Sequence, residues 1–269
     1  MPLLQAMLLG LLQGLAEFLP VSSSGHLVLV PWLLGLQDPG LTYNAVVHLG
    51  TLMAVIIHFW EDICELFVGA WRGVWFFPSK SASSRPAFLI LVSALPGAIV
   101  GYALEDFFER IFGSPPAVAG FLLVTGCILV LSERMGRGTR TTEGMGVGEA
   151  LLMGLMQACA IVPGISRSGA TISMGLLRDF DREEVTRFAF LMSIPIIMGA
   201  TGYSLVSLFT EGTSSFDLLS LGVGFGAAFL GGYVAIGVLL RHVRLYSLRP
   251  FAYYCWTVSI LCMLLYLLR

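Results

Sequence analysis

The segment from Gly10 to His26 reads Gly-Leu-Leu-Gln-Gly-Leu-Ala-Glu-Phe-Leu-Pro-Val-Ser-Ser-Ser-Gly-His, an apolar run that proline, serine and glycine break near its end. It lies inside a longer apolar segment, Met1 to Leu36, in which Glu17 is the only Asp, Glu, Lys or Arg. A straight membrane-spanning helix needs about 20 mostly apolar residues, so the break predicts two short helices joined by a polar loop. A second segment, Val147 to Leu177, is interrupted in the same way.

The two interrupted segments share one sequence pattern. Shifted by 144 residues, Gly10 to Gly25 falls on Gly154-Leu-Met-Gln-Ala-Cys-Ala-Ile-Val-Pro-Gly-Ile-Ser-Arg-Ser-Gly169. Seven of the sixteen pairs are identical, which is above chance even in a chain rich in Leu, Gly and Ser. The identical pairs are Gly10/Gly154, Leu11/Leu155, Gln13/Gln157, Ala16/Ala160, Ser22/Ser166, Ser24/Ser168 and Gly25/Gly169. The chain therefore contains an internal repeat.

The composition excludes a soluble globular protein. Of the 269 residues, 57% are hydrophobic and 12% are charged, against roughly 25% charged in an ordinary soluble domain. The net charge of −2 argues against a nucleic-acid partner, because neutralising phosphates needs a basic surface. The first residues carry no basic cluster, so we expect no cleaved signal peptide.

Six further stretches are long and apolar enough to cross a membrane without a single Asp, Glu, Lys or Arg. They run from Tyr43 to Trp60, Ala87 to Leu104, Pro116 to Ser132, Phe188 to Thr210, Leu218 to Leu240 and Pro250 to Leu268. The connections between them carry almost all the charge. We therefore predict a multi-pass membrane protein with six spans.

The basic residues indicate how the spans are oriented, because short cytoplasmic loops carry an excess of Lys and Arg. If each interrupted segment enters and leaves on one side, a single face receives twelve basic residues. The other face receives only Arg110 and Arg269, and Arg167 lies inside the second interrupted segment. The twelve are Arg72, Lys80, Arg85, Arg134, Arg137, Arg140, Arg178, Arg182, Arg187, Arg241, Arg244 and Arg249. A single crossing by the second segment would spread these loops over both faces, so re-entrance is favoured.

These patterns predict an all-α polytopic membrane protein with six transmembrane helices and two re-entrant helix-loop-helix hairpins. We expect one integral membrane domain, 1–269, built from repeats at about 1–132 and 147–269. Each repeat holds one hairpin and three spans, and an odd number of spans turns the second copy upside down. Such inverted repeats are typical of transporters, whose sites lie where the broken helices meet.

The two loop tips have the composition of an anion site. Ser22-Ser-Ser-Gly-His26 and Ser166-Arg-Ser-Gly169 each precede an apolar helix, and N–H groups at helix N-termini together with hydroxyls bind anions. Arg167 adds a planar fork of donors suited to phosphate oxygens. The alternative is that serine and glycine only cap helices and allow close packing.

Glu17 and Arg167 favour a functional site, because ionisable residues in apolar membrane segments are costly and mark function by default. The alternative is an ion pair between them that joins the two halves. Gln13 lies four residues before Glu17, on the same helical face. His26 can exchange protons near neutral pH and follows the serine loop, whereas we interpret His48 and His58 as core residues.

Together these motifs resemble those of a known family. Gln13-xxx-Glu17, Phe18-Leu-Pro-Val-Ser-Ser-Ser-Gly-His26 and Pro163-Gly-Ile-Ser-Arg-Ser-Gly-Ala-Thr171 are similar to the signatures of bacterial undecaprenyl-pyrophosphate phosphatases, the bacitracin-resistance family. The resemblance implies hydrolysis of undecaprenyl pyrophosphate to undecaprenyl phosphate and inorganic phosphate in the bacterial plasma membrane, which recycles the lipid carrier for cell-wall synthesis. It also implies a divalent cation, Mg²⁺ or Ca²⁺.

The resemblance assigns roles to matching positions. Glu17, Ser23, His26 and Arg167 are the expected catalytic residues, with Glu17 as the metal ligand; Gln13, Ser22, Ser24, Ser166, Ser168 and Thr171 are expected to bind substrate. We expect Ser23 to attack phosphorus while Glu17 and His26 handle its proton, although attack by His26 or by water stays open. Gln13 and Glu17 match the (Glu or Gln)-xxx-Glu element of the family, although a Gln in place of a second Glu weakens a two-carboxylate metal site. One position departs from the family pattern: Cys255 replaces an arginine in Phe251-Ala-Tyr-Tyr-Cys255.

Other functions stay open at this point. The Ser-Gly-His26 element is also found in phosphatidic-acid-phosphatase-type enzymes, but the Lys-x6-Arg-Pro, His and Asp elements of that type are missing here. An inverted repeat alone also fits a lipid-carrier flippase or a secondary transporter, because fold does not determine function.

The side of access is expected to be extracytoplasmic, since the first hairpin enters from outside. Glycine-rich Gly222 to Gly232 permits close helix contacts, including a homodimer.

Overall fold

The computed structural model describes residues 1–37, 39–75, 84–104, 113–210 and 217–268. Within these residues the chain forms eleven α-helices, one short 3₁₀ helix and no strand, which confirms the all-α prediction. The helices are α1 Leu3–Phe18, α2 Ser23–Leu34, α3 Gly40–His58, α4 Trp60–Trp75, α5 Ser84–Ala103, α7 Pro115–Met135, η1 Thr142–Gly144, α8 Val147–Cys159, α9 Arg167–Leu177, α10 Arg182–Thr210, α11 Leu218–Leu245 and α12 Arg249–Leu268.

The six helices α3, α5, α7, α10, α11 and α12 are long and apolar enough to cross a membrane, which confirms the six predicted spans. Their ends differ by a few residues from the predicted ones. Helix α10 begins at Arg182, six residues before the predicted span, because its first turn is charged: Glu183 and Glu184 lie at the helix N-terminus, where negative side chains are favourable.

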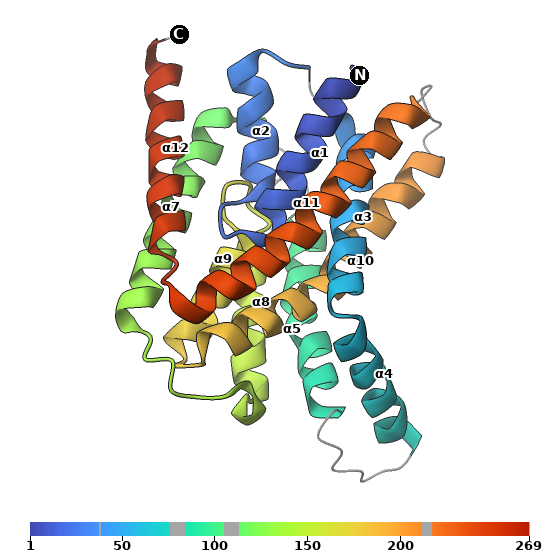
Figure 1. Ribbon diagram of the computed structural model, residues 1–269, viewed down its shortest axis with the longest axis vertical. Coiled ribbons are helices and arrows are strands. Elements are labelled where there is room, and N and C mark those ends of the chain that lie inside the picture. Colours follow the sequence, from blue (N-terminus) through green and yellow to red (C-terminus); the bar gives the residue numbers. More distant parts are fainter. Residues whose placement is uncertain (38, 76–83, 105–112, 211–216, 269) are drawn as a thin grey trace.

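Each interrupted segment folds as a pair of short helices, α1 with α2 and α8 with α9. Figure 1 shows the two helical hairpins entering from opposite ends of the molecule, with their loops meeting near mid-height. The break comes where the sequence predicts it, after Phe18 in the first hairpin and after Cys159 in the second. The re-entrant course through a bilayer, the inverted repeat and its two boundaries stay predictions.

Loops that carry basic residues gather at one end of the molecule. The connections at 136–146, 178–182 and 245–249 all lie in the lower half of the molecule in Figure 1, whereas both chain termini lie at the upper end. Lys80, Arg110 and Arg269, which the orientation argument also used, lie outside the described residues.

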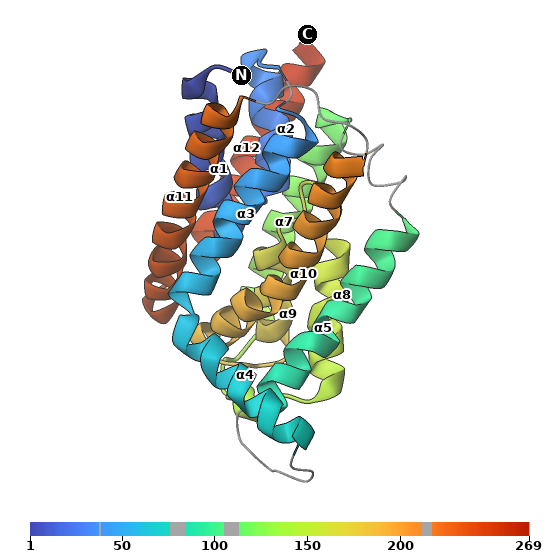
Figure 2. The same ribbon diagram turned by 90° about the vertical axis from the view of Figure 1, so that its right-hand side faces the viewer.

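A sixteen-residue helix, α4, follows the first span and was not expected from hydropathy. Its first turn carries Glu61 and Asp62, while Phe67 and Val68 are exposed. Figure 2 shows it slanting across the base of the molecule between α3 and α5. Its mixed composition is too polar for a span, and Asp62 forms an ion pair with Arg187 of α10 at 2.8 Å.

Glycines allow the first arm of each hairpin to touch a span of the other half. Gly10 and Gly14 of α1 lie directly on α11, and a Cβ at Gly14 would overlap the Ala228 carbonyl and approach the Gly232 nitrogen to 2.8 Å. The matching glycine of the second copy, Gly154 of α8, lies against the Ser93 carbonyl of α5. Small residues permit such backbone approach between membrane helices.

We expect Gly14→Ala to lower the thermal unfolding midpoint in detergent by about 5 °C, because overpacking costs about 1–3 kcal/mol and α1 must move away from α11. The control is Gly226→Ala, since a Cβ at Gly226 meets nothing within 4 Å. Removing that glycine favours the helix by up to about 1 kcal/mol. Equal midpoints for the two variants would contradict this account of the interface.

Candidate functional site

The two loop tips begin their helices with the same capping arrangement. The Ser22 hydroxyl accepts from the Gly25 N–H at 3.3 Å, and the Ser166 hydroxyl accepts from the Gly169 N–H at 3.1 Å. These four residues match in the repeat, so Ser22 and Ser166 do cap their helices, and their expected contact with substrate stays a prediction. Contacts between the two loops, such as the Ser168 hydroxyl with the Leu19 carbonyl, bring the N-termini of α2 and α9 into one region, where their positive dipole ends are available to an anion.

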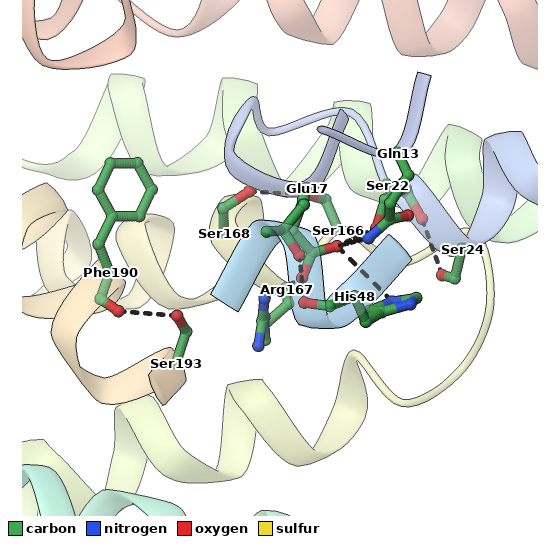
Figure 3. Close-up of polar contacts among 12 residues, drawn as sticks. Gln13, Glu17, Ser22, Ser24, His48, Ser166, Arg167, Ser168, Phe190 and Ser193 are labelled. Atoms are coloured by element: carbon green, nitrogen blue, oxygen red, sulfur yellow. Dashed lines mark hydrogen bonds and ion pairs between the residues drawn. The ribbon is translucent and has the colours of Figure 1, made fainter. Parts of the chain in front are cut away.

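Glu17 is the centre of the site (Figure 3). One carboxylate oxygen, Oε1, accepts from Arg167 Nη2 across the two halves. The other, Oε2, accepts from the Ser23 hydroxyl and from Gln13 Nε2, the latter at 2.9 Å. The structure therefore brings three other predicted residues to the buried carboxylate of Glu17, and the ion pair considered as an alternative is present.

The remaining contacts join the two loops to each other and to a span. Ser168 Oγ donates to the Leu19 carbonyl at 3.1 Å. Thr125 of α7 donates to the Gly164 carbonyl at 2.9 Å and accepts from the Ser166 N–H at 3.0 Å. Thr125 was not predicted as a site residue. It holds the second loop in the conformation that presents Arg167 to Glu17.

His48 also reaches the site, which corrects its interpretation as a simple core residue. Its Nδ1 donates to the Asn44 carbonyl at 2.7 Å, and its Nε2 lies 3.9 Å from Glu17 Oε2. The His48 side chain is 30% exposed, against 6% for Glu17. Helix α3 supplies this side chain because α1 and α3 both pack on α11.

His26 is held away from the Ser23 hydroxyl. Its Nδ1 lies 2.8 Å from the Ser22 carbonyl, and its Nε2 lies 2.8 Å from the Tyr254 hydroxyl of α12. In this arrangement Glu17, and not His26, receives the hydrogen bond of Ser23. Tyr254, like His48 and Thr125, was not predicted as a site residue, although it lies in the Phe251-Ala-Tyr-Tyr-Cys255 stretch.

The other predicted residues differ in access. Ser23, Ser24 and Arg167 are partly exposed, whereas Gln13, Ser22, Ser166 and Ser168 are buried. Ser24 Oγ lies 3.4 Å from Ser22 Oγ. The Thr171 hydroxyl donates to the Arg167 and Ser168 carbonyls within α9, at 2.8 and 3.2 Å, and is turned toward its own backbone.

The residues around Glu17 fit a hard cation only in part. In the part of the chain that the structure describes, no group of three or more His, Cys, Asp or Glu is arranged to hold a metal. However, Gln13 Oε1 is buried with no hydrogen-bond partner among the described residues, and it lies on the side chain that contacts Glu17. Magnesium is commonly held by one or two carboxylates with substrate phosphates and water. Glu17 and Gln13 meet that requirement when a phosphorylated substrate supplies the remaining oxygens.

The arrangement has the parts of a phosphoryl-transfer site. It contains a hydroxyl that donates to a carboxylate, a guanidinium beside the same carboxylate, and two helix N-termini. Only one nitrogen of the Arg167 guanidinium makes a contact within the described residues, which leaves further donors for a phosphate. A nucleophile, a base and positive donors for developing charge are the groups that such a reaction requires.

Comparison with known proteins gives one consistent result. The family model described as "Bacitracin resistance protein BacA" matches residues 6–261. A protein of Rubrobacter xylanophilus named undecaprenyl-diphosphatase is 45% identical over 269 residues, which cover 99% of each chain. A protein of the same name from Halothermothrix orenii is 42% identical over 98% of each chain. Another, from Pelobacter propionicus, is 41% identical over 94% of this chain and 93% of its own.

Proposed function

The chain belongs to the bacitracin resistance protein BacA family, and from that premise we propose that it is an undecaprenyl-diphosphatase. It is a multi-pass membrane hydrolase that converts undecaprenyl pyrophosphate to undecaprenyl phosphate and inorganic phosphate. This reaction recycles the lipid carrier for cell-wall synthesis and accounts for bacitracin resistance. The observation that carries the proposal is the buried Glu17 that joins Ser23 of one hairpin to Arg167 of the other.

The first step of the reaction uses the Ser23–Glu17 contact. Ser23 Oγ attacks the terminal phosphorus of the pyrophosphate and Glu17 accepts its proton, as the existing hydrogen bond allows. The new Oγ–P bond replaces the bond to the bridging oxygen, and undecaprenyl phosphate leaves. Water then hydrolyses the phosphoserine and releases inorganic phosphate.

Charge is stabilised by Arg167 and the N-termini of α2 and α9. Arg167 turns its remaining donors to the transferring phosphoryl group, and Ser22, Ser24, Ser166, Ser168 and Thr171 shape the surrounding cradle. Glu17 and Gln13 would hold Mg²⁺ or Ca²⁺ together with the substrate's oxygens. When bound, the cation neutralises the pyrophosphate and favours departure of the leaving group.

The first hairpin opens at the end opposite the basic loops. Because basic loops tend to face the cytoplasm, this arrangement supports access to the site from the extracytoplasmic side of the bacterial plasma membrane. The prenyl chain of the substrate stays in the bilayer, since burying it in lipid avoids exposing apolar surface to water. A homodimer and the lack of a nucleic-acid partner stay predictions.

The purified protein in detergent is expected to release inorganic phosphate from undecaprenyl pyrophosphate in the presence of Mg²⁺. Chelation with EDTA should abolish the release, and added Mg²⁺ or Ca²⁺ should restore it, because the protein alone supplies few ligands. Phosphate is measured colorimetrically, with heat-denatured protein as the control. A folded protein that releases none would contradict the proposal and favour the flippase or transporter alternative.

A further inference from the structure

Tyr254 of α12 lies against His26, far from it in sequence. The Tyr254 hydroxyl is 2.8 Å from His26 Nε2. The two rings are stacked nearly parallel, with 10° between their planes and 5.6 Å between their centroids. The neighbouring residue also meets the first loop, because Cys255 Sγ lies 3.7 Å from the Pro20 carbonyl. Helix α12 therefore contacts the first loop at two consecutive residues.

The contacts of the imidazole determine where its proton resides. A carbonyl oxygen can only accept a hydrogen bond, so Nδ1, which lies 2.8 Å from the Ser22 carbonyl, carries the hydrogen. In a neutral imidazole the other nitrogen is then an acceptor. The Tyr254 hydroxyl must consequently donate to Nε2. Both ring nitrogens of His26 are therefore hydrogen-bonded, and the tautomer with the proton on Nδ1 is the one that donates to the Ser22 carbonyl.

Ser22 needs this support because its backbone is in an unfavourable region. Its φ is +69° and its ψ is 93°, which is costly for a residue with a Cβ. Such a conformation persists only where the surroundings impose it. The Ser22 carbonyl accepts from the His26 ring and from the His26 N–H, the latter at 3.1 Å. The next residue, Ser23, is turned to Glu17 as a result.

We propose that Tyr254 is a positioning residue for the phosphatase reaction: by donating to His26 Nε2 it fixes the Nδ1–H tautomer, and that tautomer holds the Ser22 turn which presents Ser23 to Glu17. The inference rests on the proposed function for its consequence in catalysis. The assignment of the His26 tautomer is independent of the proposed function, because the tautomer is a property of the protein without substrate.

Kinetics of phosphate release test the consequence. Tyr254→Phe keeps the ring and removes the donor, so kcat should fall about tenfold with KM changed less than about twofold. Tyr253→Phe is the matched control, because Tyr253 is 57% exposed and its ring contacts Trp256. We expect this control to behave like the wild type. Equal kcat values for the wild type and Tyr254→Phe would overturn the proposal.

A double-mutant cycle shows whether Tyr254 acts through His26. In a His26→Gln background, Tyr254→Phe should change the residual kcat by less than about twofold, because the group that it positions is already absent. An independent, additive tenfold loss in that background would overturn the proposal, since Tyr254 would then act elsewhere. Thermal midpoints of all variants show whether a loss of activity reflects unfolding.

Nitrogen NMR of ¹⁵N-histidine-labelled protein tests the tautomer without any activity. The His26 signals are assigned by their loss in His26→Gln. We expect Nδ1 to carry the proton and Nε2 to give an acceptor signal, and this acceptor signal should shift in Tyr254→Phe and not in Tyr253→Phe. A wild-type His26 that carries its proton on Nε2 would overturn the proposal. If the wild type releases no phosphate, the proposed function fails, and the spectrum still decides the role of Tyr254.

Discussion

Glu17→Gln is expected to reduce kcat for phosphate release by about 10³-fold, within the range for loss of a general base. Glutamine keeps the shape of the side chain but cannot take the proton of Ser23 or balance the charge of Arg167. The substitution removes the negative charge and leaves one acceptor oxygen, so the contacts with Ser23 and Arg167 cannot both be kept. Phosphate release is measured at saturating Mg²⁺ and substrate, so that the loss reports on the chemical step and not on binding.

The same substitution also breaks a buried ion pair, which by itself costs about 3–5 kcal/mol. Glu133→Gln is the matched control. Its carboxylate is 3% exposed, pairs with Arg182 at 2.9 Å and accepts from the Leu248 N–H at 2.9 Å, at a place remote from the loop tips. We expect Glu133→Gln to lower the thermal midpoint about as much as Glu17→Gln does. The Glu133→Gln protein that stays folded should keep the wild-type kcat.

Removing both charges separates stability from catalysis. In Glu17→Gln/Arg167→Gln neither partner of this ion pair is left as an unpaired buried charge, so part of the lost stability should return. Activity should not return, because the double variant has neither the base nor the guanidinium. Recovery of phosphate release in the double variant would show that Glu17 and Arg167 only join the two halves.

The parts of this site that the sequence predicts are those with a local signal. Glu17 and Arg167 stand out because a charge in an apolar segment needs a compensating partner, and here each is the partner of the other. Ser22 and Ser166 stand out because a serine before a helix caps it. The six spans are equally local, since length and hydropathy alone identify them.

The residues that sequence reasoning missed enter the site through packing. His48, Thr125 and Tyr254 come from three different spans. Nothing in the residues around His48 and Thr125 separates them from core side chains, and the family pattern around Phe251 to Cys255 did not indicate a contact for Tyr254. Their roles depend on which helix faces a loop tip, which hydropathy does not encode. The matching pair Gln13/Gln157 illustrates the limit, because Glu17 gives Gln13 a partner while the position matching Glu17 in the second copy is Ile161. Both amide atoms of Gln157 are buried with no hydrogen-bond partner among the described residues.

The two copies consequently contribute different chemistry from equivalent places. The repeat aligns Ser23 with Arg167, and His26 with Ala170. Each copy retains the capping serine and glycine, which build the loop. In the proposed mechanism the divergent positions have different roles: Ser23 of one loop is the nucleophile, and Arg167 of the other supplies the positive charge.

Ser23→Ala is expected to reduce phosphate release by at least about 10³-fold, because the attacking oxygen is removed while the cradle remains. Substrate labelled with ³²P in its terminal phosphate, mixed rapidly with enzyme and quenched in acid, should leave label on the wild type as acid-stable phosphoserine. Ser24→Ala should still form this species, because Ser24 contacts Ser22 and not Glu17.

The quench also separates the two other routes that stayed open. Attack by His26 would give a phosphohistidine, which acid destroys and alkali preserves, and it would persist in Ser23→Ala. Attack by water would give no labelled protein at any time. The geometry favours the serine because the Ser23 hydroxyl already donates to a carboxylate, whereas both nitrogens of His26 are occupied by the Ser22 carbonyl and Tyr254. Labelled protein in Ser23→Ala would therefore refute both the nucleophile and the positioning role of His26.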